Sequence, residues 1–193
     1  MNIFFLSRDT AECARFHNDK HCVKMILDSA QLLSTAHRIL DGTPEEGLSK
    51  TGRRAKRHRL SDDRDSVLYA VTHVNHPSAV WARATNSNYV WLNGLLMDLC
   101  EEYTHRYHRV HKVESSGLLR LLRFSPTNVR VGDYSDPPAT MPDKYKVEGD
   151  IIKSYHNYYI GDKRHLARWT NRCVPRWFAE GVMLLNKDDV MLY

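Results

Sequence analysis

Apolar residues recur at helical spacing in two long segments of the chain. The spacing predicts a first helix that begins near Asp9, breaks near Asn18 and continues to about Leu40. It predicts a second helix over residues 87–108. Within the first helix, one apolar stripe is expected to face the core; it consists of Val23, Ile26, Leu27, Ala30, Leu33 and Leu40.

Further helices are expected at four places: from Pro77 onward, and over residues 118–122, 147–160 and 163–178, the last broken before Pro175. Residues 3–6 are apolar, and the stretch 2–6 predicts a short strand or an extended, packed segment. Residues 126–146 are rich in Pro, Gly and Asp and predict an irregular connection. The expected fold is therefore mainly α, a single helical domain over residues 1–193 with a short N-terminal strand or extended segment.

Residues 45–63 are polar and lack periodicity, which predicts a long, basic and mobile loop. Six cations and no acid lie between Lys50 and Arg59; they are Lys50, Arg53, Arg54, Lys56, Arg57 and Arg59. The net charge of the chain is +5, so the remainder is nearly neutral. Such a run can neutralise phosphates and make binding salt-dependent, which points to DNA as a partner. A solvated loop without a partner is the alternative.

Composition and cysteine spacing indicate in which cellular compartment the protein is expected. Hydrophobic residues make up 42% of the 193 residues, which is enough for a core, and no apolar run approaches the roughly 18 residues of a membrane span. Residues 1–6 are too short for a signal peptide. The four cysteines are scattered and contain no CxxC pair, so reduced thiols are expected. We therefore expect no membrane partner and a cytoplasmic location, which is the host cytoplasm for a phage-encoded protein.

Polar residues form a second stripe on the first helix, next to the apolar one. The stripe consists of His17, Lys20, His21, Lys24, Asp28, Gln31 and Thr35. Lys20 or Lys24 could supply an amine for attack on a sugar carbon, Asp19 or Asp28 could stabilise positive charge, and His17 or His21 could carry a proton. The alternative is an ordinary polar face, with a buried histidine and an ion pair between Lys24 and Asp28.

Other chemistry is less supported by the sequence. Cys13, His17 and His21 stand four residues apart and could share a helix face, so a zinc site is an alternative. The chain lacks the glutamate of an HExxH motif, a phosphate-binding glycine loop and a GxSxG motif. We therefore expect no metal in the site and no cofactor.

Two further groups of residues are candidates for contacts with DNA. Polar residues around the predicted helix start at Pro77 suit an anion; they are His73, Asn75 and His76. Cations interleaved with aromatic residues late in the chain suit phosphates beside stacked bases; they are Lys163, Arg164 and Arg168. Most of the neighbouring rings are equally compatible with a place in the core.

Several patterns carry a resemblance to a known family, and they extend over most of the chain. They are His17-x-Asp19-Lys20-His21-x-x-Lys24, segments 30–36 and 73–81, Met141-Pro142-Asp143-x-Tyr145, Tyr158-Tyr159 and Trp169. On these residues the chain resembles small uncharacterised proteins of tailed phages. Those proteins are similar to the pyrimidine-dimer DNA glycosylases, also called endonuclease V.

The resemblance implies a small, mainly α enzyme that flips a DNA base and cleaves through an imine. In that family the N-terminal amine forms the imine and a glutamate on an early helix assists. The early helix of this chain has no glutamate after Glu12. The resemblance therefore implies that Asp19 or Asp28 serves in its place and that Lys20 or Lys24 supplies the amine.

The leading hypothesis is a phage-type enzyme that acts on DNA bases in a glycosylase or abasic-site lyase reaction. One alternative is a transferase that modifies hydroxymethylated pyrimidines in DNA. Another is a module that binds DNA or protein without catalysis. The sequence leaves the target base and the oligomeric state open.

Overall fold

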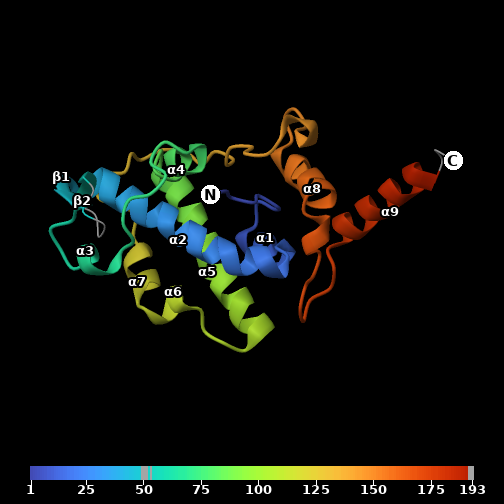
Figure 1. Ribbon diagram of the computed structural model, residues 1–193, viewed down its shortest axis with the longest axis horizontal. Coiled ribbons are helices and arrows are strands. Elements are labelled where there is room, and N and C mark those ends of the chain that lie inside the picture. Colours follow the sequence, from blue (N-terminus) through green and yellow to red (C-terminus); the bar gives the residue numbers. More distant parts are fainter. Residues whose placement is uncertain (49–51, 53, 191–193) are drawn as a thin grey trace.

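Within the described residues, nine α-helices and one two-stranded sheet make up the protein. The computed structural model describes residues 1–48, 52 and 54–190, and it is 55% helical (Figure 1). This confirms the expected mainly α single domain. The α-helices are α1 (Thr10–Phe16), α2 (Asp19–Asp41), α3 (Arg64–Val67), α4 (Pro77–Ala82), α5 (Asn86–Tyr107), α6 (Lys112–Ser115), α7 (Leu118–Leu122), α8 (Ile151–Gly161) and α9 (Arg176–Val190). The strands are β1 (Thr43–Leu48) and β2 (Arg54–Arg59), and two short 3-10 helices are η1 (Asp143–Tyr145) and η2 (Arg164–Leu166).

Helices α2 and α5 pack against each other at the centre of the domain (Figure 1). Their contact is built from fully buried apolar side chains, among them Ile26 and Leu33 of α2 and Leu92, Leu96 and Leu99 of α5. Burial of each such side chain contributes about 2 kcal/mol to folding before the loss of chain entropy. The two long helices predicted from periodicity are thus the two helices that hold the core.

The apolar stripe predicted for α2 is partly wrong. Val23 and Leu27 are 39% and 40% exposed, whereas His21 and Asp28 are buried. The reason is that the N-terminal segment packs on the helix: the ring of Phe4 stacks on that of His21, with centroids 4.1 Å apart. Because of this tertiary contact, the buried face of α2 includes His21 and Asp28 of the polar stripe and leaves out Val23 and Leu27.

The N-terminal residues 2–6 form an extended, packed segment rather than a strand. Ile3 to Leu6 are buried in the core. The side-chain oxygen of Asn2 accepts a hydrogen bond from the Tyr155 hydroxyl of α8, at 2.9 Å. The segment therefore joins α8 to the centre of the domain.

The expected lack of regular structure over residues 45–63 is wrong for most of the described residues there, which belong to strands β1 and β2. Strands β1 and β2 pair antiparallel, and their register places Glu45 opposite Arg57 and Glu46 opposite Lys56. Opposite charges on facing residues favour such pairing. Hydropathy cannot detect it, because no face of the hairpin is apolar. Lys50 and Arg53 lie outside the described residues.

The C-terminal part of the chain also differs from its prediction. Residues 163–178 do not form one helix: η2 is followed by an irregular segment, and α9 begins only at Arg176. The segment is fixed instead by tertiary hydrogen bonds, such as that from the Trp169 indole N–H to the Phe16 carbonyl at 3.0 Å. Helix α9 extends away from the rest of the domain (Figure 1). Across the described ranges, no helix has the length and apolar character needed to span a membrane.

The hairpin is held to the domain by the guanidinium of Arg38, whose side chain is 8% exposed. Its nitrogens donate to the carbonyl oxygens of His58, Leu68 and Tyr69 and form an ion pair with Asp65, at 2.6 to 2.9 Å. One planar group with five N–H donors thus satisfies two separate stretches of backbone, at residue 58 and at residues 68–69.

We predict that Arg38→Lys lowers the free energy of unfolding by about 3 kcal/mol, because one ammonium cannot replace these bonds and leaves buried acceptors unsatisfied. Urea unfolding measures the loss, and hydrogen exchange of the β1 and β2 amides should accelerate. As the control, Arg59→Lys changes a half-exposed cation that also pairs with Asp65, and its effect should stay within about 1 kcal/mol. Equal losses in the two variants would contradict the role assigned to Arg38.

Candidate functional site

His17 lies at the junction between α1 and α2 and is completely buried. Its Nδ1–H donates to the Cys13 carbonyl oxygen at 2.7 Å, which leaves Nε2 as the unprotonated nitrogen. Nε2 is buried and has no hydrogen-bond partner among the described residues. Burial lowers the pKa of His17 to about 4, so the ring is neutral at pH 7.

His21 is a second buried histidine and belongs to the contact between α2 and α8. Its Nδ1 lies 2.6 Å from the Tyr159 hydroxyl, and its backbone N–H donates to the Asn18 side chain, which caps α2. Burial, together with neighbouring cations, lowers the pKa of His21 to about 3. Both histidines therefore act in packing, and neither lines the cavity described below.

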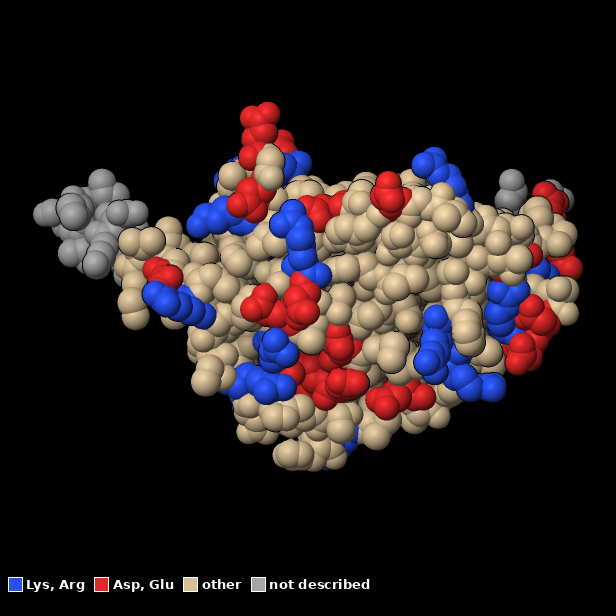
Figure 2. Space-filling model, turned by 180° about the vertical axis from the view of Figure 1, so that it is seen from behind, with Lys and Arg blue, Asp and Glu red and all other residues tan. Residues whose placement is uncertain are grey.

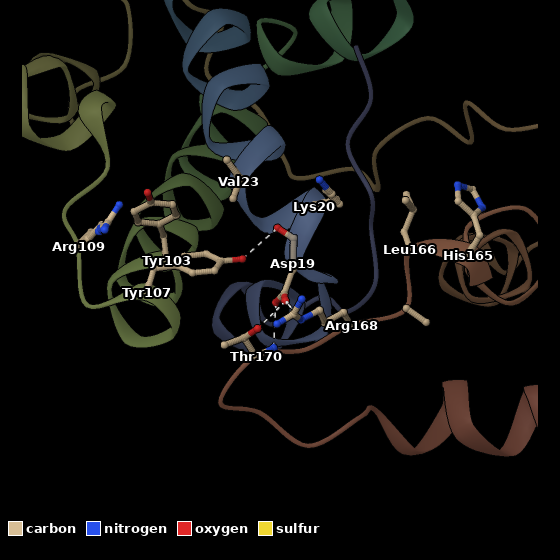
Figure 3. Close-up of a pocket in the computed structure, with 11 residues that line it drawn as sticks. Asp19, Lys20, Val23, Tyr103, Tyr107, Arg109, His165, Leu166, Arg168 and Thr170 are labelled. Carbon is tan, nitrogen blue, oxygen red and sulfur yellow. Dashed lines mark hydrogen bonds and ion pairs between the residues drawn. The ribbon is translucent and has the colours of Figure 1, made fainter.

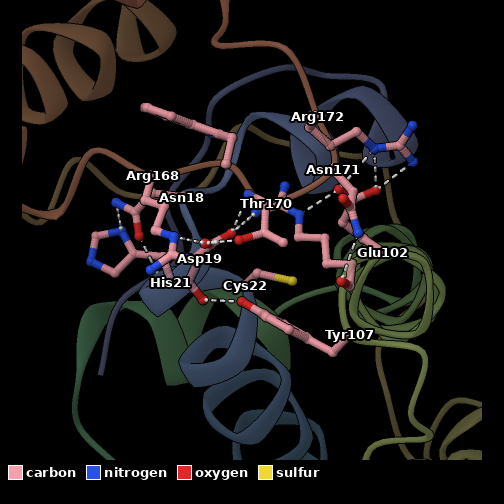
Figure 4. Close-up of polar contacts among 12 residues, drawn as sticks. Asn18, Asp19, His21, Cys22, Glu102, Tyr107, Arg168, Thr170, Asn171 and Arg172 are labelled. Atoms are coloured by element: carbon pink, nitrogen blue, oxygen red, sulfur yellow. Dashed lines mark hydrogen bonds and ion pairs between the residues drawn. The ribbon is translucent and has the colours of Figure 1, made fainter.

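Asp19 is the centre of a polar network that joins three parts of the chain (Figure 4). Its carboxylate accepts from Arg106 Nη1 at 3.0 Å, from the Thr170 backbone N–H at 3.0 Å and from the Thr170 hydroxyl at 2.7 Å. Burial alone would raise the pKa of Asp19, but the hydrogen bonds from Thr170 and Arg106 outweigh burial and lower the pKa. Asp19 is thus an ionised and well-held carboxylate.

The two lysines of the motif lie in different surroundings. Lys24 is 56% exposed in its side chain and forms an ion pair with Asp28, as the alternative interpretation of the sequence expected. Lys20 is exposed one turn earlier, and among the described residues its amine has no hydrogen-bond or ion-pair partner. Lys20 is therefore the amine of this motif that is available to a ligand.

The first turn of α2 forms the floor of a cavity of about 830 Å³. Tyr103, Tyr107 and Arg109, from the end of α5 and the residues after it, line one side (Figure 3). His165 and Leu166 of η2 line the other side, and Arg168, from the segment after η2, lies beside Asp19 and Thr170. The size is suited to a nucleotide-sized ligand.

The lining of this cavity combines cations with aromatic rings. Among the described residues that line it, Asp19 is the only acid, while Lys20, Arg109 and Arg168 are cations. Burial and the nearby Asp19 carboxylate raise the pKa of Tyr107 to about 12, so its ring stays an uncharged phenol. Aromatic faces beside cations suit an anionic ligand that carries a planar ring, such as a nucleotide.

The basic segment predicted to bind DNA is partly neutralised by acidic residues of β1 and α3. Arg59 pairs with Asp65 at 2.9 Å and with Glu45 at 3.3 Å, and Arg57 is exposed opposite Glu45. Arg54 and Lys56 lie in β2, although their side chains are not among the described ones. On the face seen in Figure 2, basic and acidic side chains are interspersed.

The residues around the start of α4 lie apart from the cavity. His76 caps α4, since its Nδ1 accepts from the Ser78 backbone N–H at 3.2 Å. His73 lies beside Thr72, with 2.6 Å between Nδ1 and the hydroxyl, and has a positive φ of 49°. Asn75 is exposed. None of these three side chains lines the cavity.

The late cationic residues are divided between two environments. Lys163 Nζ lies over the Tyr158 ring, 4.8 Å from its centroid, and Arg164 is exposed in η2. Arg168 lines the cavity. Of the three cations that the sequence marked late in the chain, one, Arg168, lines the cavity.

The zinc alternative is not supported by the placement of its residues. Cys13 lies in α1 and His21 in α2, so the helical spacing is interrupted at His17, whose Nδ1 is engaged by a carbonyl. Within the described ranges, no group of three or more His, Cys, Asp or Glu side chains could hold a metal ion.

Of the residues that line the cavity, the sequence marked only Asp19, Lys20 and Arg168 as candidates; the polar or aromatic residues that it missed include Tyr103, Tyr107, Arg109, His165 and Thr170. Tyr103 falls on the apolar period of α5, which is typical of a position that faces the core. The spacing of Tyr103 and Tyr107, one turn apart just before Arg109, was the available signal. The tyrosines line a cavity only because residues 165–170 lie opposite them, and the local sequence pattern of α5 does not predict where those residues lie.

No protein-family model, curated protein or solved structure matches this chain. The resemblance to phage DNA glycosylases therefore stays a prediction. The function is therefore inferred from the residues that line the cavity.

We predict that the protein loses stability between about pH 6.5 and pH 4. The pKa values of His17 and His37 are lowered to about 4 by burial, so the unfolded chain binds protons in this window and the folded chain does not. The free energy of unfolding should therefore fall as the pH falls, by about 1.4 kcal/mol per pH unit for each such histidine.

The variant His17→Asn tests this assignment, because its amide can still donate to the Cys13 carbonyl but does not titrate. Its pH dependence should be less steep by about one proton across the window. His165→Asn, which changes an exposed histidine on the cavity, is the control and should keep the original slope. An unchanged slope in His17→Asn would show that His17 is not buried as a neutral ring.

Proposed function

We propose that the cavity at the start of α2 binds a nucleotide of DNA and acts on its base in a glycosylase or abasic-site lyase reaction. The observation that carries this proposal is an exposed amine, Lys20, beside two tyrosine rings and two arginines in one cavity. Tyrosine faces stack on unpaired bases, and arginines hold phosphates.

In the proposed reaction, the Lys20 ammonium gives a proton to water, and the resulting amine attacks C1′ of the deoxyribose. A bond forms between C1′ and Nζ, and the bond from C1′ to the base breaks, so that the base leaves with the electron pair and takes up a proton. The nitrogen then loses one proton, which balances the proton taken up by the base. The C1′–O4′ bond breaks with its electron pair on O4′, O4′ takes up a proton from water, and the lone pair of nitrogen completes a protonated imine. The ionised Asp19 carboxylate, one residue away, stabilises the positive charge that develops on the sugar.

A second candidate is a DNA-binding module without catalysis. The burial of His17 and His21 favours it, because the proton carriers expected from the sequence are withdrawn from the cavity. The exposed His165 is the remaining imidazole in the cavity lining. The two candidates share the cavity and differ in whether Lys20 forms a bond to the substrate.

We predict that borohydride traps a covalent adduct between this protein and DNA that contains an abasic site. The adduct should be lost in Lys20→Arg, which keeps the charge but cannot form a stable imine. Lys24→Arg is the matched control, one turn along the same helix and paired with Asp28, and should keep the adduct. Denaturing gel electrophoresis and mass spectrometry of the trapped peptide give the measurement.

The other outcomes separate the alternatives. Trapping in Lys20→Arg at the original rate would refute Lys20 as the amine. DNA binding without any adduct would favour the binding module. A mass change in DNA with hydroxymethylated pyrimidines, again without an adduct, would favour the transferase.

A further inference from the structure

Arg168 differs from the other partners of Asp19. Its side chain is 80% exposed, and its Nε lies 3.5 Å from Asp19 Oδ2. Arg106, in contrast, is fully buried and reaches the same carboxylate at 3.0 Å. The guanidinium of Arg168 is therefore the weakest and most accessible contact that Asp19 makes.

The main chain at Arg168 is nevertheless fixed. The Arg168 carbonyl oxygen accepts a hydrogen bond from the Asp19 backbone N–H at 2.8 Å. The next residue, Trp169, donates its indole N–H to the Phe16 carbonyl oxygen at 3.0 Å. Thr170 is held by two hydrogen bonds to Asp19. A fixed backbone thus carries a guanidinium that stands at the edge of the cavity (Figure 3).

Asp19 does not depend on Arg168 for its charge balance. The carboxylate keeps the Arg106 guanidinium, the Thr170 N–H and the Thr170 hydroxyl when Arg168 turns away. An exposed ion pair contributes little to stability, so its exchange for another anion is nearly free of cost. Arg106 cannot make the same exchange, because its side chain is 0% exposed and is also bound to Glu102.

We infer that Arg168 exchanges Asp19 for a phosphate of the nucleic-acid backbone when a nucleotide enters the cavity. The inference rests on one part of the proposed function, namely that the cavity binds nucleic acid. It does not require that Lys20 form a bond to the substrate. Guanidinium matches a phosphate with two parallel hydrogen bonds. The tyrosine rings across the cavity would then carry the adjoining base.

Binding of a labelled single-stranded oligonucleotide of about 12 nucleotides tests this inference, measured by anisotropy between about 50 and 200 mM salt. Loss of one phosphate contact in Arg168→Gln should reduce the slope of log K against log salt by about 0.7. Arg168→Lys should keep the slope and bind several-fold more weakly. Arg176→Gln changes another exposed arginine in an ion pair, outside the cavity lining, and should match the parent protein.

Thermal unfolding separates this role from a structural one. Arg168→Gln should leave Tm unchanged, whereas Asp19→Asn should lower it. An unchanged salt slope in Arg168→Gln, or a fall in Tm equal to that of Asp19→Asn, would overturn the inference.

Competition experiments test whether the phosphate bound by Arg168 belongs to a nucleic-acid strand or to a free phosphate. Inorganic phosphate and deoxyadenosine monophosphate should displace the oligonucleotide weakly, and an unlabelled strand should displace it fully. Tight binding of inorganic phosphate without binding of the strand would overturn the assignment to nucleic acid. Normal salt slopes without borohydride trapping would refute the proposed chemistry and leave the phosphate contact supported.

Discussion

The buried guanidinium of Arg106 is the contact on which the centre of the molecule depends. It is 0% exposed and is neutralised by Glu102 on its own helix and by Asp19 at the start of α2. It also donates to the Arg15 carbonyl at the end of α1. Removing one member would leave an unpaired charge in the interior, which costs far more than the pair contributes. Three helices are therefore fixed in one arrangement, and the cavity floor is fixed with them.

The parts of the fold that local pattern determines could be predicted from the sequence. The α1–α2 break follows from two N-caps, Asp9 and Asn18, each of which accepts from a backbone N–H three residues on. The hairpin could not be predicted in this way, because its strands pair through charge and are anchored by Arg38 from a distance. The segment after η2 likewise takes its shape from Asp19 and Phe16, both about 150 residues earlier.

The candidate site was predictable in one respect and not in another. The motif at the start of α2 includes Asp19 and Lys20, which line the cavity, but it equally includes His17 and His21, which are buried. Composition cannot distinguish these pairs, because all four are polar residues within two turns. What distinguishes them is the docking of Phe4 and α8 on the histidine side of the helix.

The same docking accounts for the chemistry that the cavity offers. Successive residues on a helix are separated by about 100°, so covering His21 leaves the Lys20 side of α2 open to solvent. The apolar Val23 then becomes part of the cavity lining instead of the core. The Asp19 carboxylate below is held ionised by Arg106 and Thr170, which makes it a fixed negative charge and an unsuitable proton acceptor. The cavity therefore presents two arginines and a single lysine amine beside one fixed carboxylate.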